Sequence, residues 1–107
     1  MTTFNDREHG FESKFAHDQE IEFRAMARRN KLAARWAAGL MGLEGEHMED
    51  YVRAVVRSKI EQPGEEDVFR KLAQDLKAAG VTLTDTEIHS RMDELLALAR
   101  EQIRAGE

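Results

Sequence analysis

Residues 84–106 read TDTEIHSRMDELLALAREQIRAG and carry the signals of a complete amphipathic helix. Thr84 and Glu87 have the spacing of a capping box, in which the threonine hydroxyl accepts the amide of Glu87 and the carboxylate reaches back to the helix start. Apolar residues then recur on one face of a helix, at Ile88, Met92, Leu95, Leu96, Ala99 and Ile103. Gly106 follows the last turn, so the sequence predicts a helix between Thr84 and Gly106.

Two shorter amphipathic segments precede this helix. The nearer one starts after the turn Pro63-Gly64, ends at Gly80, and has an apolar stripe made of Val68, Leu72, Leu76 and Ala79. The other follows the turn at residues 42–45, and its stripe consists of Met48, Tyr51, Val52, Val55 and Val56. Acidic residues in the first turn of each segment favour a helix start there.

A longer helical segment is predicted over about residues 18–41, where one face carries Ile21, Ala25, Leu32, Trp36 and Leu40. Short loops between amphipathic helices of this kind predict an all-α fold, an antiparallel four-helix bundle. A chain of 107 residues is expected to form one domain. The absence of cysteine from the sequence excludes a disulfide framework and a thiolate metal site.

The first seventeen residues have a different pattern. Phe4, Phe11 and Phe15 lie within roughly 40° of one another on a helical projection, and the same line continues into Asp18 and Glu22. These three phenylalanines form an aromatic ridge that is followed on the same face by acidic residues, so the ridge is not continuous with the apolar stripe that starts at Ile21. We therefore predict a flexible segment over residues 1–17 and a helical bundle over residues 18–107, with the segment docking as a helix in the groove of a partner. The alternative is that the ridge folds back onto the bundle.

A basic cluster follows the aromatic ridge, formed by Arg24, Arg28, Arg29, Lys31 and Arg35. Guanidinium and ammonium groups gathered in this way suit a phosphate or an acidic surface, and a nucleotide is one candidate ligand. The alternative is a solvated helix face, which is the commoner role of a charge run on a helix.

No feature of the sequence indicates an enzyme or a metal site. The phosphate-binding pattern GxxxxGK[ST], the dinucleotide pattern GxGxxG and the nucleophile pattern GxSxG are all absent. The four histidines lack the i, i+4 spacing of a helical metal pair. No apolar run reaches the roughly 18 residues of a membrane span, and the net charge of −5 argues against general nucleic-acid binding.

Several stretches resemble one known family. They are MTTFNDRE at 1–8, FESKFAHD at 11–18, ARRNKL at 27–32, WAA at 36–38 and RMDELLA at 91–97. Together they are similar to the zeta subunits of alphaproteobacterial F-type ATP synthases, and the resemblance covers nearly the whole chain.

The resemblance implies a bundle whose mobile N-terminal segment enters a catalytic interface of the synthase head and blocks ATP hydrolysis. The implied partners are the alpha, beta and gamma subunits, with the protein in the cytoplasm, peripheral to the inner membrane and not inserted in it. The partner-binding residues that carry over are Phe4, Asn5, Asp6, Arg7, Glu8, Phe11, Glu12, Lys14 and Phe15. No cofactor is expected, although the family is associated with weak adenine-nucleotide binding, for which the basic cluster is the candidate site.

Two other functions compete with a protein inhibitor. The first is a small-ligand bundle that senses adenine nucleotide through the basic cluster. The second is a structural adaptor without a regulatory effect.

Overall fold

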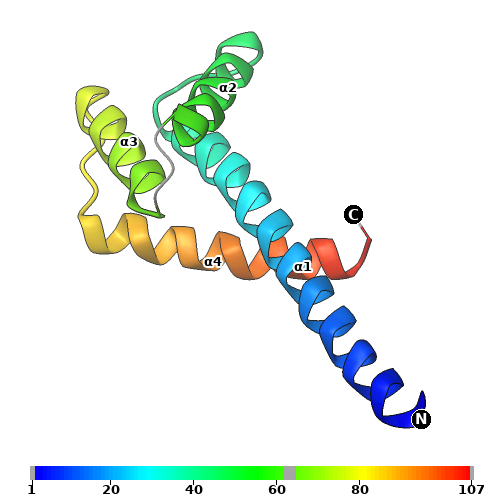
Figure 1. Cartoon of the computed structure of the whole chain (residues 1–107). Helices are drawn as coiled ribbons and strands as arrows, with labels where there is room; N and C mark the ends of the chain where they lie inside the picture. The colour runs from blue at the N-terminus through cyan, green and yellow to red at the C-terminus, as the bar shows by residue number, and fades with distance from the viewer. Residues whose placement is uncertain (1, 62–64, 107) are drawn as a thin grey trace.

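A computed structural model describes the backbone of residues 2–61 and 65–106 and the side chains of residues 17–59 and 66–106. The residues with a described backbone form four helices: α1 (Thr2–Leu40), α2 (Glu46–Glu61), α3 (Glu65–Ala78) and α4 (Asp85–Arg104) (Figure 1). The described backbone contains no strand, so the all-α, four-helix prediction is confirmed. The predicted division into residues 1–17 and 18–107 stays a prediction, because the side chains before residue 17 lie outside the described part.

The long helix α1 organises the other three. It packs mainly against α4 and α2, and smaller contacts join α3 to α2, α1 and α4. Figure 1 shows α4 crossing α1, with α2 and α3 gathered on one side of the crossing. The result is an elongated molecule of 65 × 26 × 25 Å.

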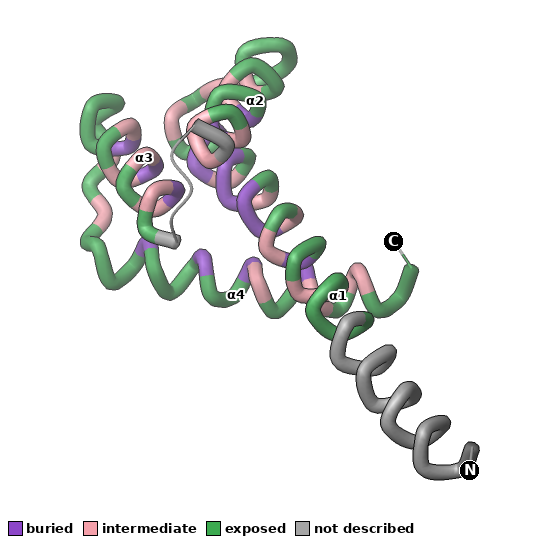
Figure 2. The backbone as a smooth tube through the Cα atoms, in the orientation of Figure 1, coloured by how far each residue is buried: buried purple, intermediate pink, exposed green. Residues whose placement is uncertain are grey.

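The core is made of small residues on α1 and larger ones on the other helices. Five alanines of α1 are fully buried, at positions 25, 33, 34, 37 and 38. Ala33, Ala34 and Ala37 belong to one core cluster with large buried side chains from the other three helices, which include Val55, Leu72, Leu76 and Ile88. Figure 2 shows the buried residues on the sides of the helices that face one another. Alanine lets neighbouring helices approach closely, so the side chains of the shorter helices fill the space between them.

The predicted core stripe of α1 is partly wrong. Leu40 is 45% exposed, and Leu32 and Trp36 are only half-buried against the core. Four of the five residues of the predicted stripe are large apolar residues, and the fifth is Ala25. Because α1 has neighbours on more than one side, its buried face is wider than one stripe, and much of it consists of the alanines.

A polar contact joins α2 to α3 beside this core. The Tyr51 hydroxyl donates to Asp75 Oδ2 at 2.8 Å, and Lys71 Nζ lies 3.2 Å from the same oxygen. Burial raises the pKa of Tyr51 well above its usual value, and the bond to Asp75 raises it further. Tyr51 therefore stays neutral and donates its proton over the whole working pH range.

The predicted helix ends are confirmed for α3 and α4. The Glu87 amide donates to Thr84 Oγ1 at 3.1 Å, and the Thr84 hydroxyl donates to the Glu87 carboxylate at 3.2 Å. After α3, Gly80 has a φ of +82°, the Val81 amide donates to the Leu76 carbonyl at 2.9 Å, and the Gly80 amide donates to that of Lys77 at 3.0 Å. This pair of bonds is a Schellman motif.

The substitution Gly80→Ala is expected to destabilise the protein by about 1–2 kcal/mol, the cost of a left-handed conformation for a residue with Cβ. Nothing lies within 4 Å of a Cβ built there, so the cost is one of backbone conformation alone. Gly39→Ala is the matched control, since Gly39 lies inside α1 and is equally open. It is expected to stabilise by about 0.5–1 kcal/mol. Urea denaturation of the two variants measures both values, and equal midpoints would contradict the assigned role of Gly80.

Candidate functional site

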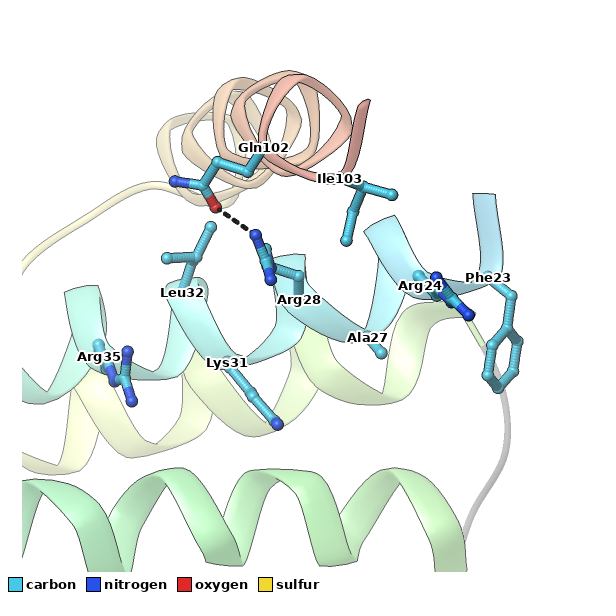
Figure 3. A pocket seen from close by; sticks show the side chains of 9 residues that line it. All are labelled: Phe23, Arg24, Ala27, Arg28, Lys31, Leu32, Arg35, Gln102 and Ile103. Atoms are coloured by element: carbon cyan, nitrogen blue, oxygen red, sulfur yellow. Dashed lines mark hydrogen bonds between the residues drawn. The ribbon is translucent and has the colours of Figure 1, made fainter. Parts of the chain in front are cut away.

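A groove of about 650 Å³ lies between α1 and α4 and is rich in positive charge. Its cationic side chains are Arg24, Arg28, Lys31 and Arg35, all from α1. Its other lining residues are Phe23, Ala27 and Leu32 from α1, and Gln102 and Ile103 from α4 (Figure 3). We call this feature the basic groove. It brings together four of the five residues predicted as a basic cluster.

Helical spacing explains why these four cations share one groove. Positions 24, 28, 31 and 35 follow one another at intervals of four, three and four residues, so they lie within about 60° of one another around the helix axis. Figure 3 shows them along the length of the groove, with α4 running above. The local sequence of α1 therefore sets the charge of the groove, and α4 supplies part of its wall.

Arg29, the fifth residue of the predicted basic cluster, does not line the basic groove. One residue after Arg28, its side chain is turned by about 100° around the helix. It is only 7% exposed, and its Nε donates to Asn30 Oδ1 at 3.0 Å. Arg29 is therefore part of the interior of the bundle.

The cations of the groove are held by neighbouring groups to different degrees. Arg24 Nη2 lies 2.6 Å from Glu20 Oε1, and Arg35 Nη2 lies 3.9 Å from Glu49 Oε1. Arg28 Nη1 donates to Gln102 Oε1 at 3.3 Å, which is the bond drawn in Figure 3. Lys31 is exposed. Exposed ion pairs such as those of Arg24 and Arg35 contribute about 0–1 kcal/mol, so an anionic ligand can replace the carboxylates at small cost.

An ion pair near the basic groove fastens α4 to α1. Arg100 donates to both carboxylate oxygens of Glu22, from Nε at 3.0 Å and from Nη2 at 2.6 Å. These bonds lower the pKa of Glu22, against a smaller opposing effect of burial and with further help from the charges of Arg100 and Arg104. Because both side chains are more than a third exposed, the pair contributes at most about 1 kcal/mol. Its two-point geometry restricts the relative orientation of the two side chains, while the buried core carries most of the packing of α4 on α1.

The predicted partner-binding residues all precede residue 17, where the described side chains begin. They are Phe4, Asn5, Asp6, Arg7, Glu8, Phe11, Glu12, Lys14 and Phe15, and their side chains lie outside the described residues. The ridge of aromatic residues therefore stays a sequence prediction.

The sequence prediction missed Phe23, Gln102 and Ile103. Phe23 is 76% exposed and stands at the end of the basic groove (Figure 3). Phe23 lies outside the predicted core stripe and next to Arg24 in the sequence, and this position could have indicated a surface role beside the basic cluster. The two α4 residues had no such signal, because only tertiary packing brings residue 102 to residue 28.

Two kinds of site find no support in the described part of the chain. Residues 17–59 and 66–106 contain no group of three or more histidine or acidic side chains placed to hold a metal ion. None of the described helices has the length and apolar character needed to cross a membrane.

Comparisons with known proteins give a consistent result. A solution NMR structure has 33% sequence identity to this chain, with a TM-score of 0.67, and the match covers 81% of this chain and 99% of that one. Curated proteins give no match to the sequence. The model of the family described as ATPase inhibitor subunit zeta matches residues 1–102. This match spans nearly all of the four-helix fold and both predicted sites, and the chain therefore belongs to the ATPase inhibitor subunit zeta family.

Proposed function

We propose that this protein inhibits ATP hydrolysis by an F-type ATP synthase by inserting residues 1–17 as a helix into a catalytic interface of the synthase head. The observation that carries the proposal is the family match over residues 1–102, which includes the whole aromatic ridge. The expected partners are the alpha, beta and gamma subunits, on the cytoplasmic side of the inner membrane.

The described core is consistent with separate roles for residues 1–17 and for the helical bundle. Among the described side chains, every buried one lies between Ala25 and Ala99. Residues 17–24 therefore add no side chain to the described core. Large aromatic anchors at positions 4, 11 and 15, flanked by charges of both signs, suit docking of a helix in a groove.

The inhibition follows from differential affinity. The catalytic interfaces of a rotary head open and close during turnover. A helix wedged into one interface binds one conformation more tightly than the others, so it holds the head in that conformation. The bundle stays outside the interface as the bulky part of the inhibitor.

The test is to add the full chain to a purified synthase head and measure the rate of ATP hydrolysis. We expect the rate to fall with increasing protein. The variant Phe11→Ala is expected to weaken docking by about 1–4 kcal/mol, as for a hot-spot residue. Leu98→Ala serves as the control, because this side chain is 41% exposed on α4. An unchanged rate with the wild-type chain would contradict inhibition, and an unchanged affinity for Phe11→Ala would contradict the assigned ridge.

A second function, nucleotide binding, is favoured by the basic groove. We infer that the groove accepts an adenine nucleotide, with the phosphates against Lys31, Arg28 and Arg35 and the base towards Phe23. A volume of about 650 Å³ lies within the size range of small-molecule sites. Apolar lining next to cationic side chains suits a ligand that is aromatic at one end and anionic at the other.

An NMR titration of the full chain with ATP tests this inference. We expect shifts at the amides of residues 23–35 and 102–103 that weaken with added salt. Lys31→Gln is expected to reduce the affinity, whereas Arg91→Gln should leave it unchanged, because Arg91 is an exposed arginine of α4 outside the groove. No shifts at millimolar ATP would overturn the inference.

A further inference from the structure

Phe23 lines a second groove in addition to the basic groove. The second groove lies between α1 and α2 and has a volume of about 330 Å³. Its lining is mostly apolar and consists of Phe23, Met26, Ala27, Asn30, Lys31, Val56 and Lys59. We call it the apolar groove. Phe23 is the most exposed of the large apolar side chains in the described part of the chain, at 76%. An exposed phenylalanine that continues an apolar groove indicates a surface covered by another molecule.

We propose that the apolar groove is a second docking surface for the synthase head, and that its occupant is an amphipathic helix of the head with acidic flanks. The proposal rests on the proposed function for the identity of the partner. It adds a contact that lies outside residues 1–17 and is made by the bundle itself.

The charge around the groove selects an acidic occupant. Lys31 and Lys59 lie among its lining residues, and Arg24 and Arg28 line the adjoining basic groove. Lys31 is exposed and makes no ion pair or hydrogen bond with the other described residues. The chain as a whole carries a net charge of −5, so this positive region contrasts with the average surface. Apolar contact in the groove and carboxylates beside the lysines would satisfy both features of the surface.

The position of Phe23 along α1 links this groove to the proposed inhibitory segment. Residues 15 and 23 belong to the same helix. Eight residues of α-helix advance the chain by about 12 Å and turn it by about 80°. A partner that binds residues 1–17 thus lies within reach of Phe23, which makes the two surfaces neighbours on one helix.

The test compares two polar substitutions on α1 of the full chain. Phe23→Gln removes the exposed ring, and Leu40→Gln is the matched control, with a leucine that is 45% exposed at the C-terminal end of the same helix. Both variants should keep the wild-type circular dichroism and melting, because neither side chain is buried. Phe23→Gln is expected to raise the concentration needed for half-maximal inhibition about tenfold, with unchanged inhibition at saturation, and Leu40→Gln should change neither.

A charge reversal tests the acidic occupant separately. Lys31→Glu is expected to weaken binding of the full chain to the purified head and to reduce the dependence of that binding on salt. Lys77→Glu, on α3, is the control for the change in net charge. Equal binding and equal salt dependence of the two variants would overturn the acidic occupant.

The outcomes separate this inference from the proposed function. If the wild type inhibits and Phe23→Gln inhibits equally well, the second docking surface is wrong and the inhibitor function stands. If the wild type binds the head without inhibiting it, the inhibitor function is wrong, and a weaker binding of Phe23→Gln still supports the surface. If the wild type does not bind, both are wrong. A dimer in solution that Phe23→Gln dissociates would assign the groove to a second copy and overturn the proposal.

Discussion

Deletion of residues 1–17 is expected to abolish inhibition of ATP hydrolysis and to leave the four helices folded. The deletion removes all the aromatic anchors of the proposed docking segment, so the binding energy that traps one conformation of the head is lost. It removes no described core residue, because the buried side chains lie between Ala25 and Ala99. The remaining part of α1 keeps its contacts with α2 and α4.

Three measurements check this prediction. The inhibition assay with purified head should show full activity in the presence of the shortened chain. Circular dichroism should show the helical content expected of the helices from residue 18 onward, and the melting temperature should stay close to that of the full chain. A full-length chain with serine at positions 4, 11 and 15 is the control for length. Loss of cooperative melting on deletion would instead show that the aromatic ridge packs onto the bundle.

The substitution Leu72→Ala is expected to have the largest effect on stability. Leu72 is fully buried in the middle of α3 and belongs to the core cluster that joins all four helices. Truncating a buried leucine to alanine typically costs about 2–5 kcal/mol, because transfer energy is lost and a cavity remains. A domain of this size has roughly 5–15 kcal/mol of stability in total. Each kcal/mol lowers the melting temperature of a small domain by about 4–8 °C.

Leu98→Ala is the matched control for this substitution. It makes the same chemical change on α4 at a side chain that is 41% exposed. Its effect should stay within about 0.5 kcal/mol, as for surface substitutions in general. Thermal melting and urea denaturation measure both variants. A loss below about 1 kcal/mol for Leu72→Ala would contradict the packing of α3 against the other helices.

The three shorter helices were predictable because local chemistry and periodicity agree in them. Thr84 and Glu87 cap α4 as their spacing predicts, and Gly80, which has a positive φ, follows the end of α3 as predicted. In α4, four of the six predicted apolar residues are buried. In such helices a single apolar face packs against a single core, so the apolar periodicity predicts nearly all of the buried residues.

The long helix was harder to predict, because its buried face depends on neighbours distant in sequence. The buried alanines from Ala33 to Ala38 do not stand out in a search for large apolar residues, whereas the exposed Leu40 does. The same difficulty affected the candidate site. Arg28 and Arg29 are equivalent in a count of positive charges. They differ in the structure because each residue of a helix is rotated by about 100° from the one before it, so the two side chains leave α1 in different directions. Gln102 and Ile103 join the groove through packing alone.

The uninterrupted course of α1 from Thr2 to Leu40 has a mechanical consequence. In a single helix, the azimuth of one end is locked to that of the other. One alanine inserted directly after Asp18 would rotate the N-terminal end of α1 by about 100° around the helix axis relative to the grooves. Seven inserted residues would bring that rotation back to within about 20° of the original and lengthen the helix by about 10 Å. The number of residues between the two ends of α1 therefore sets their relative rotation as well as their distance.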